Sequence, residues 1–177
     1  MPATTTPSGE SIDRYVAQIS RRPLLTREAE RALAERYRQQ GDLTAAQELV
    51  ASNLRFVVKI AYQYRGYGLG LLDLIQEGNI GLMIAVKKFD ATRGHRLISY
   101  ALWWIRAYMQ SYIMHSWSLV KVGTTRAQRT LFFKLRSERA RANREAGPGE
   151  VATALDLAKK LHVTAHELVD MEMRMSG

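Results

Sequence analysis

The sequence of 177 residues contains no cysteine. This absence excludes disulfide bonds, thiolate metal ligands and cysteine nucleophiles. The sequence also lacks the run of about 18 uninterrupted apolar residues that a membrane-spanning helix requires. Residues 1–10 include neither a basic nor an apolar stretch, so we expect a disordered leader rather than a signal peptide. Together these absences predict a soluble protein that stays in the cytoplasm.

Acidic residues are scarce between Lys87 and Arg144. This block has thirteen Lys or Arg residues against two acidic ones, a balance of +11, which leaves −2 for the rest of a chain whose net charge is +9. Such asymmetry is typical of a surface that binds a polyanion, although a solvated basic helix face is the alternative. The block also lacks the carboxylate cluster of metal-dependent nucleases, so we expect no catalytic residue, metal or cofactor.

Aromatic side chains are interleaved with arginines between Phe89 and Trp117. After Phe89 the aromatic residues are Tyr100, Trp103, Trp104, Tyr108, Tyr112 and Trp117, and the arginines are Arg93, Arg96 and Arg106. Arginines can follow phosphates while flat rings stack on unpaired bases, so the run predicts a surface for single-stranded nucleic acid. Trp103 and Trp104 lie about 100° apart on a helix, and we expect one in the core and one at the surface.

Helix signals dominate the chain and strand signals are nearly absent, which predicts an all-α fold. Thr26 is a candidate N-cap for a helix that ends near Gln40, before the helix-breaking pair Gly41-Asp42. Further helices are expected over residues 43–64, 71–89 and 97–117, and a basic helix from Thr124 or Thr125 to about Asn143.

Residues 145–177 have the pattern of a small helix-turn-helix that follows a Gly-Pro-Gly break. One helix ends near Leu161, and Thr164 with Glu167 forms a capping box that starts the next. His162 and His166 flank this turn, but zinc normally needs about three protein ligands, so no metal is expected there.

The helix predicted over residues 71–89 has an acidic stripe within a basic protein. Asp73, Gln76 and Glu77 are three and four residues apart and therefore share one helix face. This face is either the solvent side of a buried helix or a docking surface for a basic partner. Gly78 and Gly81 leave the same helix flat enough for another helix to approach closely.

Three strings resemble the conserved second domain of bacterial sigma factors of the housekeeping superfamily: NLRFVVKIAYQYRG, LLDLIQEGNIGLMIAVKKFD and ISYALWWIRAYMQSYI. A later run is similar to a signature of the heat-shock (RpoH-like) subgroup and includes Gln128, Arg129, Leu131, Phe132, Phe133, Leu135 and Arg136. The resemblance implies a leader (1–10), a second sigma domain (11–117), a linker with a basic helix (118–144) and a partial, helix-turn-helix-like third domain (145–177). The family's fourth domain is missing, so we expect a fragment.

The resemblance implies a promoter-recognition subunit and not an enzyme. Its partners would be core RNA polymerase and promoter DNA, with chaperones and a regulatory protease implied by the heat-shock subgroup. We expect docking on the clamp helices of the largest polymerase subunit by Asp73, Gln76, Glu77 and Asn79. We expect capture of the melted minus-ten non-template strand by Phe89, Arg93, Arg96, Ser99, Tyr100, Trp103, Trp104, Arg106 and Gln110. A second base pocket is expected at Asn53, Arg55 and Phe56, and contacts with the DNA backbone are expected at Lys121, Arg126 and Arg129.

Three positions depart from the housekeeping pattern and predict altered promoter choice. His95 and Leu97 stand where the family has aromatic residues near the captured adenine. Ala107 replaces a glutamine that reads the upstream edge of the element, and Gln110, about one turn later, can bond adenine in its place. Two other classes remain open: a free-standing helix-turn-helix regulator that binds duplex DNA, and a small nucleic-acid enzyme.

Overall fold

The computed structural model describes residues 8–116, 128, 131–135, 137–138, 141, 154–161 and 163–176. Every secondary-structure element among these residues is helical, which confirms the predicted all-α class. The chain divides into two compact units, Met1–Ser116 and Trp117–Gly177, each of which is described by itself. No helix in the described ranges is long and apolar enough to cross a membrane.

Local capping signals set the boundaries of the central helices. Helix α2 (Arg27–Gln40) begins after Thr26, whose hydroxyl accepts a hydrogen bond from the Ala29 N–H at 3.2 Å. Helix α3 (Leu43–Tyr64) begins after Asp42, whose carboxylate accepts from the N–H groups of Thr44 and Ala45. A short 3₁₀ turn, η1 (Arg65–Tyr67), leads to α4 (Leu71–Lys88), and η2 (Ala91–Arg93) leads to α5 (Leu97–Ser116).

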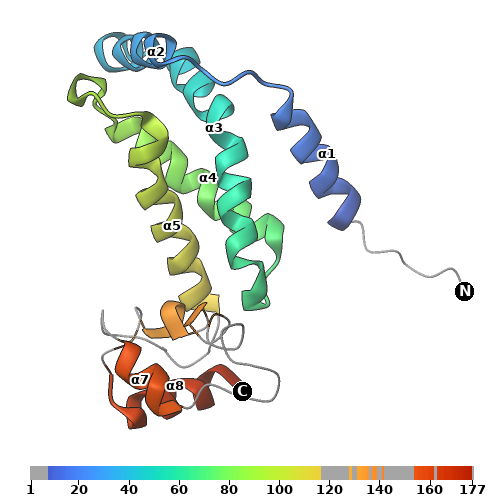
Figure 1. The fold of residues 1–177 in the computed structure, drawn as a ribbon. Helices are drawn as coiled ribbons and strands as arrows, with labels where there is room; N and C mark the ends of the chain where they lie inside the picture. The colour runs from blue at the N-terminus through green and yellow to red at the C-terminus, as the bar shows by residue number, and fades with distance from the viewer. Residues whose placement is uncertain are drawn as a thin grey trace, which may run out of the picture. The chain divides into compact units, whose positions relative to one another are not determined.

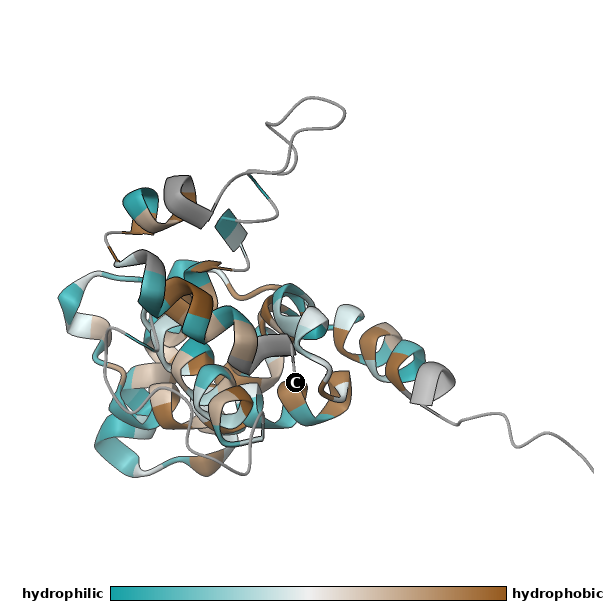
Figure 2. Cartoon of the chain, turned by 90° about the horizontal axis from the view of Figure 1, so that it is seen from below, coloured by the Kyte–Doolittle hydropathy of each residue, from teal (hydrophilic) through white to brown (hydrophobic). Residues whose placement is uncertain are grey.

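The core of the first unit lies where α4 packs against both α3 and α5 (Figure 1). Hydrophilic and hydrophobic residues alternate along the helices, as amphipathic packing requires (Figure 2). The largest fully buried side chains here are Leu49, Val57, Leu74, Ile75, Leu82, Leu97, Ile105, Met109 and Ile113. Leu97 therefore belongs to the core, whereas the resemblance led us to expect it near a captured base.

Glycines allow α4 to approach its neighbours closely, as the sequence predicts. A Cβ atom on Gly81 would lie 2.8 Å from the Trp104 carbonyl oxygen and 2.9 Å from Ile105 Cα, both in the α5 backbone. A Cβ atom on Gly78 would instead meet two side chains: it would clash with Met109 Cε and lie 2.6 Å from Val57 Cγ1. The absence of a side chain at Gly81 thus allows α5 of the same chain to pack closely against α4.

Helix α1 (Ser8–Ser20) was not expected, and it begins within the stretch predicted to be a disordered leader. Ile12, Tyr15, Val16 and Ile19 recur at helical spacing, and Ile19 is buried. Helix α1 packs against α3. Arg55 of α3 adds to this packing by donating hydrogen bonds to the carbonyl oxygens of Ser20, at 3.0 Å, and Arg22.

Candidate functional site

The segment between α4 and α5, residues 89–96, forms one side of a cavity of about 190 Å³. The residues that line the cavity are Lys88, Phe89, Asp90, Arg93, His95 and Tyr100. The rings of Phe89 and Tyr100 lie 6.2 Å apart between centroids, with their planes tilted by 36°. This volume corresponds to about six water molecules at roughly 30 Å³ each, and the lining combines aromatic faces with cationic groups. Such a lining suits a planar group attached to an anion.

The aromatic surface continues from this cavity along α5. Trp104 is half-buried, with its ring 6.4 Å from Tyr100 in an edge-on arrangement and with Lys88 Nζ 4.4 Å from its centroid. Trp103 is 75% exposed. The prediction of one tryptophan at the surface is thus confirmed by Trp103, whereas Trp104 lies at the edge of the α4–α5 packing rather than in the core.

The arginines of this region differ in what they contact. Arg93 and Arg106 are exposed, as is Ser99, and Arg93 Nε lies 3.7 Å from the Asp90 carboxylate. Arg96, which we expected at the DNA, is held by the protein itself: its Nε bonds to Glu30 at 3.1 Å and its terminal nitrogen to the Leu25 carbonyl at 3.0 Å.

Glu30 of α2 is a residue that the sequence analysis missed. Its side chain is only 4% exposed, and one carboxylate oxygen accepts both from Arg96 and from the Leu97 N–H, at 2.8 Å. The Leu97 N–H is one of the donors that the first turn of α5 leaves unpaired, so Glu30 caps α5 from another helix. A glutamate in the first turn of a helix is normally explained by the favourable interaction of its charge with the dipole of that helix. The sequence alone therefore does not indicate that Glu30 caps a different helix.

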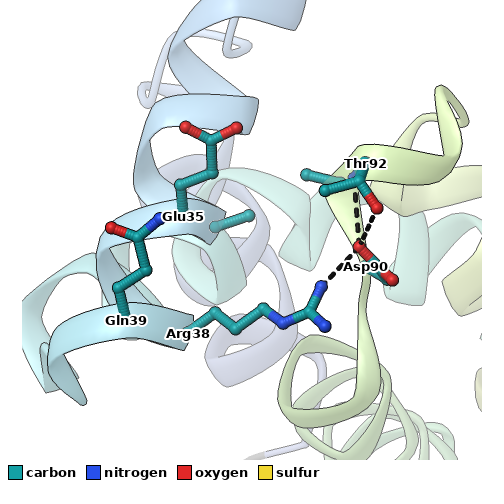
Figure 3. A pocket seen from close by; sticks show the side chains of 7 residues that line it. Glu35, Arg38, Gln39, Asp90 and Thr92 are labelled. Carbon is teal, nitrogen blue, oxygen red and sulfur yellow. Dashed lines mark hydrogen bonds and ion pairs between the residues drawn. The ribbon is translucent and has the colours of Figure 1, made fainter.

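Two further residues of α2 contact the segment between α4 and α5. Arg38 reaches Asp90 at 2.6 Å beside a cavity of about 400 Å³ (Figure 3). Arg27 donates to the Gly94 carbonyl. Asp90 also accepts from the Thr92 hydroxyl at 2.6 Å and the Thr92 N–H at 3.1 Å. These hydrogen bonds, and then the charge of Arg38, lower the pKa of Asp90 below its usual value.

A second cavity, of about 330 Å³, contains two of the three residues expected at a second base pocket. Its lining residues are Leu24, Leu25, Glu30, Ser52, Asn53, Phe56, Arg96 and Ile98. Asn53 is buried and its amide donates to the Leu49 carbonyl at 2.8 Å. Arg55 is not among the lining residues, because its guanidinium is bonded to the end of α1.

The predicted docking residues lie on α4, where Asp73 and Gln76 are exposed and Glu77 and Asn79 are half-buried. The Asn79 amide nitrogen lies 3.5 Å from the Gln76 side-chain oxygen, while Asn79 Oδ1 is buried without a hydrogen-bond partner in the described part of the chain. Two apolar side chains extend this surface: Ile80 and Met83 are 39% and 50% exposed. We call Asp73, Gln76, Glu77, Asn79, Ile80 and Met83 the α4 face.

The remaining predicted residues are only partly described. Gln110 donates one of its two amide N–H groups to the Tyr64 hydroxyl at 3.0 Å. Lys121, Arg126, Arg129 and Arg136 lie outside the described residues, as does most of the predicted basic helix. In the heat-shock signature Leu131, Phe132 and Leu135 are buried, and the rings of Phe132 and Phe133 lie 5.1 Å apart.

The second unit contains the predicted helix pair, α7 (Ala154–Leu161) and α8 (Ala165–Ser176). The capping box is present: the Glu167 N–H donates to the Thr164 hydroxyl at 3.2 Å, and the Glu167 carboxylate accepts from the Thr164 N–H at 2.9 Å. Leu157, Leu168 and Met171 are buried in this unit.

The first unit thus combines an aromatic, cationic cavity with a helix face of acidic and apolar side chains. Two family models match it in succession: "Sigma-70 factor, region 1.2" over residues 10–43 and "Sigma-70 region 2" over residues 49–118. The chain belongs to the sigma-70 family, as the sequence predicts.

The chain is similar to several named sigma factors. RNA polymerase sigma-C factor of Myxococcus xanthus is 55% identical over 96% of this chain and 58% of that protein. RNA polymerase sigma factor RpoH of Rhizobium radiobacter is 46% identical over 98% of this chain and 58% of that protein. RNA polymerase sigma-B factor of Myxococcus xanthus is 59% identical over 73% of this chain and 52% of that protein. The chain thus spans little more than half the length of the curated relatives it matches.

Proposed function

We propose that this chain binds core RNA polymerase through the α4 face and holds the melted minus-ten non-template strand of a promoter at the aromatic cavity and along α5. The observation that carries this proposal is the cavity of about 190 Å³, which Phe89, Arg93 and Tyr100 line. The exposed Trp103 follows Tyr100 by three residues on α5. The chain acts by binding, and the polymerase supplies the chemistry.

Capture of an unpaired base at this cavity favours strand separation. A base that leaves the duplex loses its stacking and pairing, and stacking on an aromatic side chain returns about 1–3 kcal/mol per base. Lys88 and Arg93 provide positive charge at the cavity for the adjoining phosphates. The exposed Trp103 lies about one turn after Tyr100 on α5. Its ring can stack on the neighbouring base or base pair.

The α4 face suits a helical partner that carries basic and apolar side chains. Asp73 and Glu77 provide negative charge, whereas Ile80 and Met83 provide apolar surface on the same helix. Apolar surface at the centre with charges beside it is the usual composition of a protein interface. Similarity to RpoH proteins supports promoters of the heat-shock type as targets, and control by chaperones and a regulatory protease stays a prediction.

Two variants separate the two activities. Gln76→Ala combined with Glu77→Ala should weaken binding to bacterial core RNA polymerase, while Glu48→Ala, an exposed glutamate on α3, should leave it unchanged. Trp103→Ala should impair open-complex formation but not polymerase binding, and Tyr62→Ala, at an exposed aromatic residue of α3, is its control. Unchanged polymerase affinity in the double variant would refute the docking assignment. Tight binding to duplex DNA without polymerase would instead favour a free-standing regulator.

A further inference from the structure

The sulfur atoms of this chain all belong to methionines. The sequence contains seven methionines and no cysteine. In the described ranges Met109, Met114 and Met171 are buried, whereas Met83 on α4 is 50% exposed and Met173 on α8 is 65% exposed. Oxidation of a side chain requires contact with an oxidant in solution, so it is favoured at exposed sulfur atoms. Among the described methionines of the first unit, Met83 is therefore the accessible one.

Met83 lies on the α4 face, close to features that indicate a covering partner. Gln76 and Ile80 precede Met83 by seven and three residues, so the three side chains project within about 60° of helix circumference. Ile80 is 39% exposed, and the two apolar side chains are thus neighbours at the surface. Asn79 Oδ1, four residues before Met83, is buried without a hydrogen-bond partner in the described part of the chain. Buried acceptors are normally paired, which favours a donor supplied by another molecule.

Oxidation would change the polarity of this surface at its apolar part. A peroxide transfers one oxygen atom to the thioether of Met83: an S–O bond forms and the O–O bond breaks. Sulfur is oxidised by two electrons, and with hydrogen peroxide as the oxidant the other oxygen leaves as water. The sulfoxide is a polar hydrogen-bond acceptor, and a polar group that loses its water without gaining a hydrogen bond opposes burial. Methionine sulfoxide is therefore unfavourable beneath the apolar surface of a bound partner.

We infer that Met83 is a modification site, at which a peroxide converts the thioether to the sulfoxide and so weakens docking of the α4 face on core RNA polymerase. The identity of the partner rests on the proposed function, whereas the accessibility of the sulfur is a property of the free chain. The effect runs in both directions, because polymerase bound over the α4 face shields the thioether from the oxidant. Methionine sulfoxide reductase returns the sulfoxide to the thioether, so the modification is reversible.

The first experiment needs no polymerase. The 177-residue chain is treated with hydrogen peroxide under native conditions, and mass spectrometry of its peptides follows sulfoxide formation at each methionine. Met83 should be oxidised at least about ten-fold faster than Met109, whose side chain lies in the core. Equal rates at these two residues would overturn the site.

The second experiment measures the affinity for core RNA polymerase before and after peroxide treatment. Wild type, Met83→Leu and Met173→Leu are each compared with their own untreated form. Leucine is apolar, similar in volume to methionine and free of sulfur, and Met173→Leu is the matched control at the exposed methionine of α8. Oxidation should weaken binding about ten-fold in wild type and in Met173→Leu, and reductase treatment should reverse the loss. Met83→Leu should keep its untreated affinity, and an equal loss in this variant would overturn the inference.

Two further measurements separate this inference from the docking assignment on which it rests. Saturating polymerase should slow the oxidation of Met83 about ten-fold, and an unchanged rate would contradict a site beneath the partner. Met83→Gln, a permanently polar side chain of similar length, should weaken polymerase binding about ten-fold.

The double variant Gln76→Ala with Glu77→Ala then decides which claim fails. If it weakens polymerase binding while oxidised wild type and Met83→Gln bind as tightly as untreated wild type, the docking assignment stands and the modification inference fails. If all of these proteins bind polymerase as tightly as untreated wild type, the docking assignment fails and the inference fails with it.

Discussion

Replacement of Gly81 by alanine should force α4 and α5 apart. The added Cβ would lie 2.8 Å from the Trp104 carbonyl oxygen and 2.9 Å from Ile105 Cα. Both atoms belong to the α5 backbone, so the clash is relieved only by moving a whole helix and not by rotating a side chain. Overpacking of a core typically costs about 1–3 kcal/mol, and a backbone clash belongs at the upper end. Because alanine regains about 1 kcal/mol in helix propensity, we expect a net loss of about 2 kcal/mol.

Gly78→Ala is the matched control, because it makes the same chemical change on the same helix. Its clashes are with Met109 Cε and Val57 Cγ1, and the methionine terminus can adopt another rotamer. We therefore expect a smaller loss, and Met109→Leu should recover part of it by removing the contacting methyl. No single side-chain change should rescue Gly81→Ala.

Urea unfolding followed by tryptophan fluorescence measures both variants. In a Trp117→Phe background the signal comes from Trp103 and Trp104, so it reports on α5. With a slope of about 1–3 kcal/mol per molar urea, a loss of 2 kcal/mol lowers the midpoint by about 1 M. A Gly81→Ala protein as stable as wild type, or less affected than Gly78→Ala, would refute the close backbone contact.

Three further predictions follow from the contacts of single residues. Thr164→Ala should lower the stability of the second unit by about 1 kcal/mol through loss of the capping box, measured by thermal unfolding, whereas Thr164→Ser should retain it. Glu30→Ala should destabilise the first unit by about 2 kcal/mol in urea, because Arg96 and the Leu97 N–H lose their acceptor, and an unchanged midpoint would contradict the capping of α5. The pKa of Asp42 is held below its usual 3.8 by hydrogen bonds from the Ala45 N–H and from Arg36. The folding stability that the ionised Asp42 carboxylate provides is therefore present above pH 3.8 and is lost as the pH falls through the lowered pKa. Asp42→Asn, which can still cap α3, should therefore flatten the loss of stability below pH 4, and an acid profile identical to wild type would argue against this linkage.

Much of the first unit could be predicted from the sequence because its signals are local. Thr26 and Asp42 cap their helices within three residues, and Gly41 ends α2, so the bounds of α2 and α3 agree with the prediction. The bounds of α4 and α5 agree to one residue. Helix α1 was not predicted, although its apolar residues between Ile12 and Ile19 recur with helical spacing; only its first three residues lie in the stretch 1–10 that was interpreted as a leader.

The candidate site was less predictable, because its decisive contacts join distant parts of the chain. Glu30 and Arg96 are 66 positions apart, and no periodicity within α2 or α5 indicates that they meet. An arginine in a basic, aromatic run resembles a phosphate ligand whether or not a buried carboxylate already holds it. Arg55 was assigned to a base pocket because the family resemblance implied it, whereas its guanidinium bonds to carbonyl groups at the end of α1 and just beyond it.

We propose that the polymerase-bound chain opens a promoter by capturing the non-template strand at the aromatic cavity and along α5. Permanganate reactivity of thymines in the minus-ten region of a duplex promoter tests it most directly. We expect reactive thymines only when core polymerase and the chain are both present, and a strong reduction with Trp103→Ala at equal polymerase occupancy. Thymines that react equally well with Trp103→Ala, or that react with the chain alone, would contradict the account.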